Sequence, residues 1–262
     1  MPLISDYHNH PLGHDPNRKY TVELLTEWAN CAKKRGLKDV ALTDHDRYHE
    51  GVDFDVFLSF KESLRDNLKF RIGIELDNDP ETSEKGKKWT EKNYENLDFV
   101  LGSVHFLDDW PFDHPNYKDE FLKHDINKLY EKYFKQVQTV IESGLVDGLA
   151  HFDLIKIFGY RPTEDLSWLI DETLDLVKSK DLTVELSTAG WNKPVNEIYP
   201  EEKIIQKIKE KDIPITIASD AHAPENLAKH YNRLEKILVQ YQFSEVAVFE
   251  NHKRHMIPII LK

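Results

Sequence analysis

The sequence contains one cysteine, Cys31, and it has few glycines, few prolines and no long apolar run. A single cysteine cannot form a disulfide within the chain, and it excludes a metal site built from several thiolates. The 10 glycines and 12 prolines, together with 40% hydrophobic residues, indicate a folded globular protein and not a disordered one. Apolar stretches stay below the ~18 residues of a membrane-spanning helix, and the N-terminus lacks the pattern of a targeting segment. We therefore expect a cytoplasmic protein with no membrane partner.

Positive charge is also scarce. The chain has 35 Lys and Arg residues against 47 Asp and Glu residues, which gives a formal net charge of −12. A general nucleic-acid binder needs a basic face that neutralises phosphates, so we expect no nucleic-acid partner. A small phosphate ester is still compatible with this balance, because bound divalent metal ions reverse the local field.

Apolar strand-like segments alternate with amphipathic helical segments along the whole chain. We predict seven main strands and a final short one, at residues 3–7, 39–43, 70–76, 99–104, 146–150, 183–186, 214–218 and 246–249. We predict helices at residues 21–36, 55–68, 80–97, 126–143, 165–180, 201–211 and 224–240, the last of them in two pieces. Such alternation implies parallel pairing through right-handed crossovers, and the length suits one barrel-like α/β domain spanning residues 1–262. The predicted fold is a distorted (β/α)7 barrel. An open doubly wound sheet is the alternative, because periodicity cannot show closure.

Residues 106–115 interrupt this alternation. They contain Trp110, Phe112, two prolines and three aspartates, a composition that predicts no regular element. A long irregular loop beside the carboxyl end of a strand is more often functional than not. We expect this loop to contribute to a site at that end of the barrel.

Nearly every predicted strand ends in a histidine or a carboxylate, and only the strand that ends near Ser187 does not. In a parallel barrel the carboxyl ends of the strands meet at one mouth. Neutral imidazoles and carboxylates are the ligands of zinc, iron and related divalent ions. The sequence therefore predicts a multinuclear metal centre with nine candidate ligands: His8, His10, His14, His45, Glu75, His105, His151, Asp220 and His222. Asp6 lies on the same face as His8 and His10 and is expected to orient one of their rings.

The motifs around these ligands resemble those of the polymerase-and-histidinol-phosphatase (PHP) family. The resemblance rests on His8-Asn9-His10, Asp44-His45, Gly73-Ile74-Glu75, Gly102-Ser103-Val104-His105, His151 and Ser219-Asp220-Ala221-His222, in that order. It implies a distorted (β/α)7 barrel with up to three metal ions. The implied ligand sets are His8, His10, Glu75 and Asp220 for one ion, Glu75, His105 and His151 for a second, and His14, His45 and His222 for a third.

Several loops are similar to those of the family's phosphatases that act in histidine biosynthesis. They include the residues 10–14, 103–110, 151–162 and 187–190. The resemblance implies hydrolysis of a small phosphate monoester, L-histidinol phosphate, with three divalent ions of zinc, iron or manganese as cofactors. Trp110 and Phe112 are then expected to give the imidazole of this substrate a stacking surface, and the aspartates of their loop to supply charge.

Hydrolysis of a phosphate monoester needs groups that bind the phosphate and a group that protonates the leaving alkoxide. Arg161 and Lys193 follow the fifth and sixth strands and are the candidate phosphate-binding residues. The candidate acids, which the sequence does not rank, are Asp44, Asp153 and His222.

Three other readings stay open at this point. A PHP phosphoesterase acting on nucleotides or oligonucleotide ends would use the same ligands, although the acidic balance disfavours polymers. A metal-dependent amidohydrolase also uses a His-x-His pair, later histidines and a late aspartate. A metal-binding structural or regulatory module without activity is the third, and the complete ligand set disfavours it.

Overall fold

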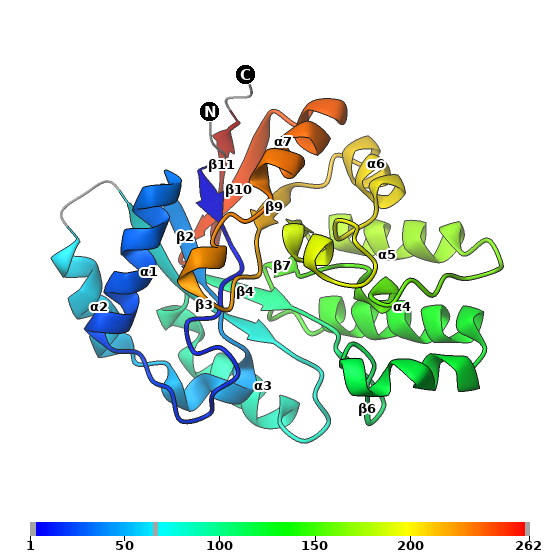
Figure 1. Ribbon diagram of the computed structural model, residues 1–262, viewed down its shortest axis with the longest axis horizontal. Coiled ribbons are helices and arrows are strands. Elements are labelled where there is room, and N and C mark those ends of the chain that lie inside the picture. Colours follow the sequence, from blue (N-terminus) through cyan, green and yellow to red (C-terminus); the bar gives the residue numbers. More distant parts are fainter. Residues whose placement is uncertain (1–3, 65–67, 260–262) are drawn as a thin grey trace.

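The computed structural model describes residues 4–64 and 68–259. Its main sheet has seven parallel strands, and helices surround this sheet (Figure 1). The strands are β1 (Ser5–Asp6), β2 (Asp39–Leu42), β3 (Lys69–Leu76), β4 (Phe99–Gly102), β7 (Gly148–Leu149), β8 (Thr183–Ser187) and β9 (Ile215–Ala218). Their order in the sheet is their order in the chain, and each neighbouring pair is parallel. Each connection therefore crosses over to the next strand, as the alternation in the sequence predicts.

The segment that follows β1 pairs with β9 and with the residues that follow β9. The backbone N–H of Tyr7 donates to the Ile217 carbonyl (3.0 Å), and that of His10 donates to the Ala221 carbonyl (2.8 Å). Asn9 and Ala221 form an isolated parallel bridge in the same place. The sheet thus closes nearly completely into a barrel. The predicted (β/α)7 barrel is confirmed, and the open doubly wound alternative is wrong.

One helix follows each main strand on the outside of the barrel (Figure 1). The helices are α1 (Val22–Arg35), α2 (Phe54–Ser63), α3 (Ser83–Asn93), α4 (Ile126–Glu142), α5 (Ser167–Ser179), α6 (Glu202–Glu210) and α7 (Tyr231–Gln240). The ends of α1 show why the sequence folds this way. The Thr21 side chain accepts a hydrogen bond from the Leu24 N–H (3.1 Å), and Gly36 ends the helix in the left-handed conformation with φ 78°. None of the helices within the described ranges is long and apolar enough to cross a membrane.

Some predicted boundaries differ from the structure. Helix α2 ends at Ser63 and not near residue 68, and residues 65–67 lie outside the described chain, as does residue 3 of the first predicted strand. The predicted helix at 80–97 is α3 followed by a 3-10 turn, Tyr94–Asn96. The helix at 224–240 comes in two pieces, as predicted: the 3-10 turn Pro224–Asn226 and α7.

The prediction of an irregular loop at 106–115 is wrong. These residues form a short hairpin, β5 (Phe106–Leu107) with β6 (Trp110–Pro111), and a 3-10 helix Pro115–Lys123 follows. Asp108 makes the tight turn possible because it adopts a positive φ of 57°, a conformation that aspartate tolerates.

A second hairpin was predicted only in part. Strands β10 (Glu245–Glu250) and β11 (Lys253–Pro258) pair antiparallel around Asn251 and His252, whose φ angles are 50° and 60°. The Phe249 ring packs 4.6 Å from that of Phe99, where β4 begins. The hairpin therefore covers the amino ends of the strands, opposite the ends that carry the candidate ligands.

Candidate metal centre

Glu75 is the central residue of the ligand cluster. It lies on β3 with no exposed surface, and its two carboxylate oxygens face different imidazoles. Oε2 lies 3.2 Å from His8 Nε2 and 2.8 Å from His45 Nδ1. Oε1 lies 3.1 Å from His151 Nε2 and 3.3 Å from His105 Nε2. One carboxylate from β3 thus connects histidines that follow β1, β2, β4 and β7, which is the geometry of a bridging ligand.

A second part of the cluster lies at the junction of β1 and β9. His10 Nε2 is 3.2 Å from Asp220 Oδ1 and 3.6 Å from Glu75 Oε2. The rings of His10 and His222 stack with centroids 4.2 Å apart, and His14 lies 4.5 Å from His222 by the same measure. The closure of the barrel brings these residues together, because Asn9 and Ala221 pair directly between them.

Ligand atoms come within 4.8 Å of one another in four overlapping groups of three. The groups are His8, Glu75 and His151; His8, His10 and Asp220; His45, Glu75 and His105; and His10, His45 and His222. Of the nine candidates only His14 belongs to none of these groups. Its ring contacts the ring of His222, which belongs to the cluster, and its centroid lies 5.9 Å from that of the His45 ring.

The donors fit divalent metal ions. Several buried atoms of the cluster make no hydrogen bond, although short distances to a carboxylate oxygen join some of them: His8 Nε2, both ring nitrogens of His10, His45 Nδ1, Glu75 Oε2 and His222 Nε2. Buried polar atoms are nearly always paired in folded proteins, so a set of unpaired atoms on converging side chains indicates a missing partner. Imidazole nitrogens around a shared carboxylate are the donor set that zinc, iron and manganese accept.

Desolvation and neighbouring rings lower the pKa of two of the histidines. Burial and the nearby His222 and His45 rings hold the pKa of His10 well below its ordinary value. His14 is an exposed residue, but partial desolvation and the same two rings lower its pKa to about 4. Neutral imidazole is the form that binds a metal. Burial raises the pKa of the Glu75 carboxyl, but the neighbouring His45 and His8 outweigh it and hold this pKa well below the ordinary value. The bridging position therefore carries a negative charge.

Glu185 is a functional residue that the sequence analysis missed. It is fully buried on β8, its Oε2 lies 2.8 Å from His8 Nδ1, and its Oε1 accepts a hydrogen bond from the His151 N–H (3.1 Å). The sequence signal was a carboxylate inside an otherwise uncharged strand. Glu185, and not Asp6 as expected, is the carboxylate that orients one of the rings of the His8–His10 pair. The carboxylate of Asp6 accepts hydrogen bonds from the backbone and hydroxyl of Ser219 (2.9 and 2.6 Å), so that expectation is wrong.

Asp113 has the corresponding role for His105. Its Oδ2 lies 2.9 Å from His105 Nδ1, which turns Nε2 of that ring toward Glu75. Burial raises the pKa of Asp113, but His105 outweighs it and lowers this pKa below the usual range. The loop at residues 106–115 thus supplies negative charge to the centre through Asp113, which orients the candidate metal ligand His105.

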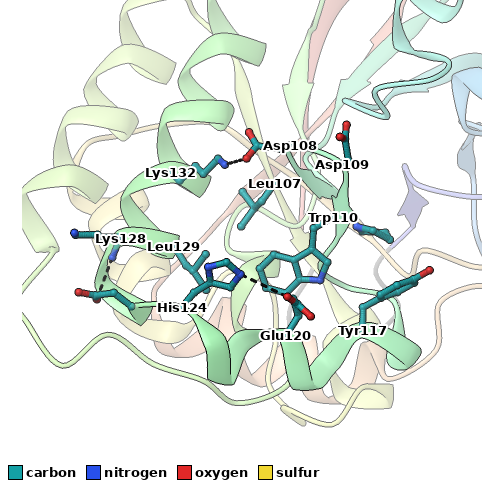
Figure 2. Close-up of a pocket in the computed structure, with 12 residues that line it drawn as sticks. Leu107, Asp108, Asp109, Trp110, Tyr117, Glu120, His124, Lys128, Leu129 and Lys132 are labelled. Carbon is teal, nitrogen blue, oxygen red and sulfur yellow. Dashed lines mark hydrogen bonds and ion pairs between the residues drawn. The ribbon is translucent and has the colours of Figure 1, made fainter.

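The same loop does not supply the expected aromatic surface beside the metal ligands. Phe112 is fully buried, with its ring 5.6 Å from that of Tyr133, so it cannot stack on a substrate. Trp110 packs on Phe121 and His124 and lines a cavity of about 650 Å³ between the β5–β6 hairpin and α4 (Figure 2). None of the nine candidate ligands lines that cavity.

The three candidate acids lie in different surroundings. Both oxygens of Asp44 are occupied, one by the Leu12 N–H (2.8 Å) and one by the Tyr20 hydroxyl (2.8 Å), and burial raises its pKa to about 7. Asp153 Oδ2 accepts from the Glu201 N–H (2.9 Å) and pairs with Lys156 (2.9 Å). The geometry argues against Asp44 as the acid, because it holds the segment between His10 and His14. The His222 side chain is 31% exposed, and its Nε2 is unpaired.

The two candidate phosphate-binding residues also differ. Arg161 is already paired, with Nη2 2.5 Å from Glu197 and Nη1 3.5 Å from Glu201. Lys193 is exposed and lines a cavity of about 480 Å³ together with Asp113, which holds His105. The geometry therefore favours Lys193 over Arg161 as a group that reaches a ligand beside the centre.

Fold and site together define the class: a parallel α/β barrel whose carboxyl-terminal mouth carries a cluster of histidines and carboxylates that could hold metal ions. A family model described as PHP domain matches residues 19–189. The chain belongs to the PHP family, as the motifs predict.

Similar proteins carry one recurrent description. The chain is 31% identical over 226 residues to a "Probable histidinol-phosphatase" of Deinococcus radiodurans, covering 80% of this chain and 85% of that protein. It is 23% identical to the histidinol-phosphatase of Bacillus subtilis, covering 76% and 87%. The solved histidinol phosphate phosphatase of Lactococcus lactis, complexed with zinc, L-histidinol and phosphate, matches with a TM-score of 0.76 at 19% identity, over 96% of this chain and 98% of that one. At that identity the likeness shows the fold.

Proposed function

We propose that this protein is a metal-dependent phosphatase that hydrolyses L-histidinol phosphate to L-histidinol and phosphate, a step of histidine biosynthesis. The observation that carries the proposal is the buried Glu75 carboxylate facing four imidazoles at the mouth of the barrel. The 31% identity to a relative described as a histidinol-phosphatase supports the choice of substrate. The phosphate and L-histidinol bound in the similar Lactococcus lactis protein support it as well.

Three divalent ions of zinc, iron or manganese are proposed as cofactors. The ligands would be His8, His10, Glu75 and Asp220 for one, Glu75, His105 and His151 for a second, and His14, His45 and His222 for the third. When bound, such ions supply the chemistry of phosphate-ester hydrolysis by lowering the pKa of water from 15.7 toward ~7 and by neutralising phosphate charge. The orphaned nitrogens of the cluster support this assignment.

The remaining groups act on the substrate or on the ligands. Glu185 orients His8, and Asp113 orients His105. Each carboxylate contacts Nδ1 of its histidine and leaves Nε2 free to bind a metal. We propose that Lys193 binds the phosphate as a point charge. A neutral His222 that binds the third ion has no proton to give to the leaving alkoxide, so Asp153, whose Oδ1 has no hydrogen-bond partner, is the proposed acid. Arg161 would reach the phosphate only by leaving Glu197.

The nine candidate ligands do not line the cavity of about 480 Å³, but the cavity adjoins the centre through Asp113, which contacts His105. Its lining has the chemistry that L-histidinol phosphate requires. Ile157, Phe158 and Tyr160 give it an apolar and aromatic wall against which an imidazole would pack. Asp113 and Asp119 offer carboxylates to the amine, and Lys193 offers a cation to the phosphate. A substrate that carries an aromatic ring, an amine and a phosphate would use each of these surfaces.

The decisive experiment compares substrates. The protein is loaded with zinc, iron or manganese, and phosphate release is measured from L-histidinol phosphate, nucleoside monophosphates and short single-stranded oligonucleotides. We expect the kcat/KM for L-histidinol phosphate to exceed that for the other esters by at least about 10²-fold, because only this substrate combines an imidazole and a phosphate with a cationic amine that the carboxylates can bind. Equal rates on unrelated monoesters would reject the specific assignment, and a preference for nucleotides would favour the other phosphoesterase reading. Metal analysis of the same samples tests for three ions per chain, against the one or two of an amidohydrolase site.

The single domain over residues 1–262 and the cytoplasmic location stay predictions.

A further inference from the structure

Tyr199 stands at the one strand end that carries no candidate ligand. Its backbone pairs with that of Ser187 at the end of β8: the Ser187 N–H donates to the Tyr199 carbonyl (2.7 Å), and the Tyr199 N–H donates to the Ser187 carbonyl (3.0 Å). In the sheet β8 lies between β7 and β9, whose ends carry His151 and Asp220. The Tyr199 ring meets the His151 ring edge-on, with centroids 6.4 Å apart. Tyr199 therefore borders the metal centre.

The Tyr199 hydroxyl is buried and has no hydrogen-bond partner within residues 4–64 and 68–259. Each of the other buried tyrosines in these ranges donates a hydrogen bond: Tyr7 to Asp39, Tyr20 to Asp44, Tyr130 to the Tyr160 carbonyl, Tyr133 to the Phe152 carbonyl and Tyr231 to the Ser5 carbonyl. An unpaired buried hydroxyl costs free energy, so its position is explained best by a ligand that accepts its hydrogen bond.

The charges around the hydroxyl keep it protonated. Burial raises the pKa of Tyr199 well above its ordinary value, and the carboxylates of Asp153 and Asp113 raise it further, followed by Asp220. These acids come from the segments that follow β7, β6 and β9. A neutral hydroxyl in such acidic surroundings is a donor, and a phosphate is the acceptor that this site is proposed to bind.

The ring of Tyr199 is held in place before any ligand binds. The fully buried Lys156 lies with Nζ 5.2 Å from the ring centroid, and it is fixed by the Ile198 carbonyl (2.7 Å) and Asp153 (2.9 Å). Gly190 leaves room for the ring, because a Cβ there would come within 2.9 Å of the ring and 2.1 Å of the Glu197 carbonyl. A donor fixed in this way needs little reorganisation when the substrate arrives.

We infer that Tyr199 is a catalytic residue of this site and that its hydroxyl donates a hydrogen bond to a nonbridging oxygen of the substrate phosphate. The inference rests on the proposed function. The charge on these oxygens is what the site must stabilise in the transition state, and a preorganised donor does so without adding charge.

Tyr199→Phe tests the inference, with Tyr231→Phe as the matched control. Tyr231 is also buried, but its hydroxyl donates to the Ser5 carbonyl (2.9 Å). For Tyr199→Phe we expect kcat/KM on L-histidinol phosphate to fall roughly 10²-fold. The inhibition constant of inorganic phosphate should weaken on the order of tenfold. Metal content should stay unchanged and Tm without phosphate should not fall, because no hydrogen bond within the protein is lost and an unpaired buried hydroxyl is removed. Tyr231→Phe should lower Tm and leave phosphate inhibition unchanged.

A spectroscopic readout separates this inference from the choice of substrate. In protein labelled at the tyrosine Cζ, added inorganic phosphate should shift one resonance, and that resonance should be absent in Tyr199→Phe. Such a shift together with no hydrolysis of L-histidinol phosphate would reject the proposed function and leave the Tyr199 contact standing. A Tyr199→Phe variant that binds phosphate as the parent does would overturn the inference, as would a parent protein that binds no phosphate at all.

Discussion

Glu185 holds His8 in a single orientation: its Oε2 lies 2.8 Å from His8 Nδ1, while Nε2 of the same ring faces Glu75 at 3.2 Å. A carboxylate that accepts from one ring nitrogen fixes the proton there and leaves the opposite nitrogen free to bind a metal. The same glutamate accepts from the His151 N–H, so one side chain of β8 positions ligands of two strands.

Glu185→Gln is therefore expected to weaken metal binding by about 10- to 100-fold, because the amide is a weaker acceptor and allows the other tautomer. The measurement is zinc affinity by competition with a chromogenic chelator. Glu142→Gln, an exposed position at the end of α4, is the control and should bind zinc as the parent does. Unchanged affinity in Glu185→Gln would show that the contact does not position His8.

The comparison of Glu185 with Glu75 shows what the sequence could and could not predict. Glu75 lies near the end of an apolar strand, and a parallel barrel brings all such ends to one mouth, so the ligands follow from strand order alone. Glu185 lies within its strand, and its contact with His8 joins residues 177 positions apart, for which local pattern gives no signal. Both hairpins were missed in whole or in part because their turns use Asp108, Asn251 and His252 at positive φ in place of glycine.

Glu75→Gln should remove most of the activity. The amide keeps the shape of the side chain, but it carries no charge and offers one oxygen in place of two, so His105 and His151 would lose the group that joins them to His8 and His45. We expect a loss of several kcal/mol in transition-state stabilisation, about 10³-fold in kcat. Metal content per chain, measured by elemental analysis, should fall in parallel. Full metal content with full activity would remove Glu75 from its bridging role.

Metal removal should lower the thermal stability. The mouth of the barrel contains imidazoles and carboxylates that lack hydrogen-bond partners, and an ion that binds only the folded chain stabilises it by mass action. An ion at 100 times its Kd adds about 2.7 kcal/mol, which corresponds to roughly 5–10 °C in the Tm of a chain of this size. Differential scanning fluorimetry before and after dialysis against a chelator measures the shift. Returning zinc should restore the Tm, and a Tm indifferent to both treatments would contradict a metal centre.

His252 gives the fold a pH dependence that is separate from the metal centre. Its Nδ1 lies 2.8 Å from Asp147, and its Nε2 lies 2.9 Å from the Tyr94 carbonyl. Burial lowers the pKa of His252, but these two contacts outweigh it and raise the pKa above the ordinary value. A raised pKa in the folded state stabilises the fold fully below the unfolded value of ~6.5, and this stabilisation is lost as the pH rises through the folded pKa.

His252→Gln should therefore cost about 0.5–1 kcal/mol at pH 6 and less at pH 9. The measurement is the free energy of unfolding in urea for both proteins at the two pH values. The gap between them should close as the pH rises. A gap of the same size at both values would mean that the charge on His252 contributes nothing and that only its ring packing on Tyr94 matters.

Asp44 allows a test of positioning against acid catalysis at one residue. Its oxygens accept from the Leu12 N–H and the Tyr20 hydroxyl, and they hold the segment that carries His10 and His14. In Asp44→Asn the amide oxygen still accepts from Leu12, and the amide nitrogen donates to the Tyr20 oxygen, so we expect kcat within about tenfold of the parent. Asp44→Ala loses both contacts and should bind less metal per chain. If Asp44 instead protonates the leaving group, Asp44→Asn will lose as much kcat as Asp44→Ala while it keeps its metals. Parallel measurement of kcat and metal content in the two variants decides between these roles.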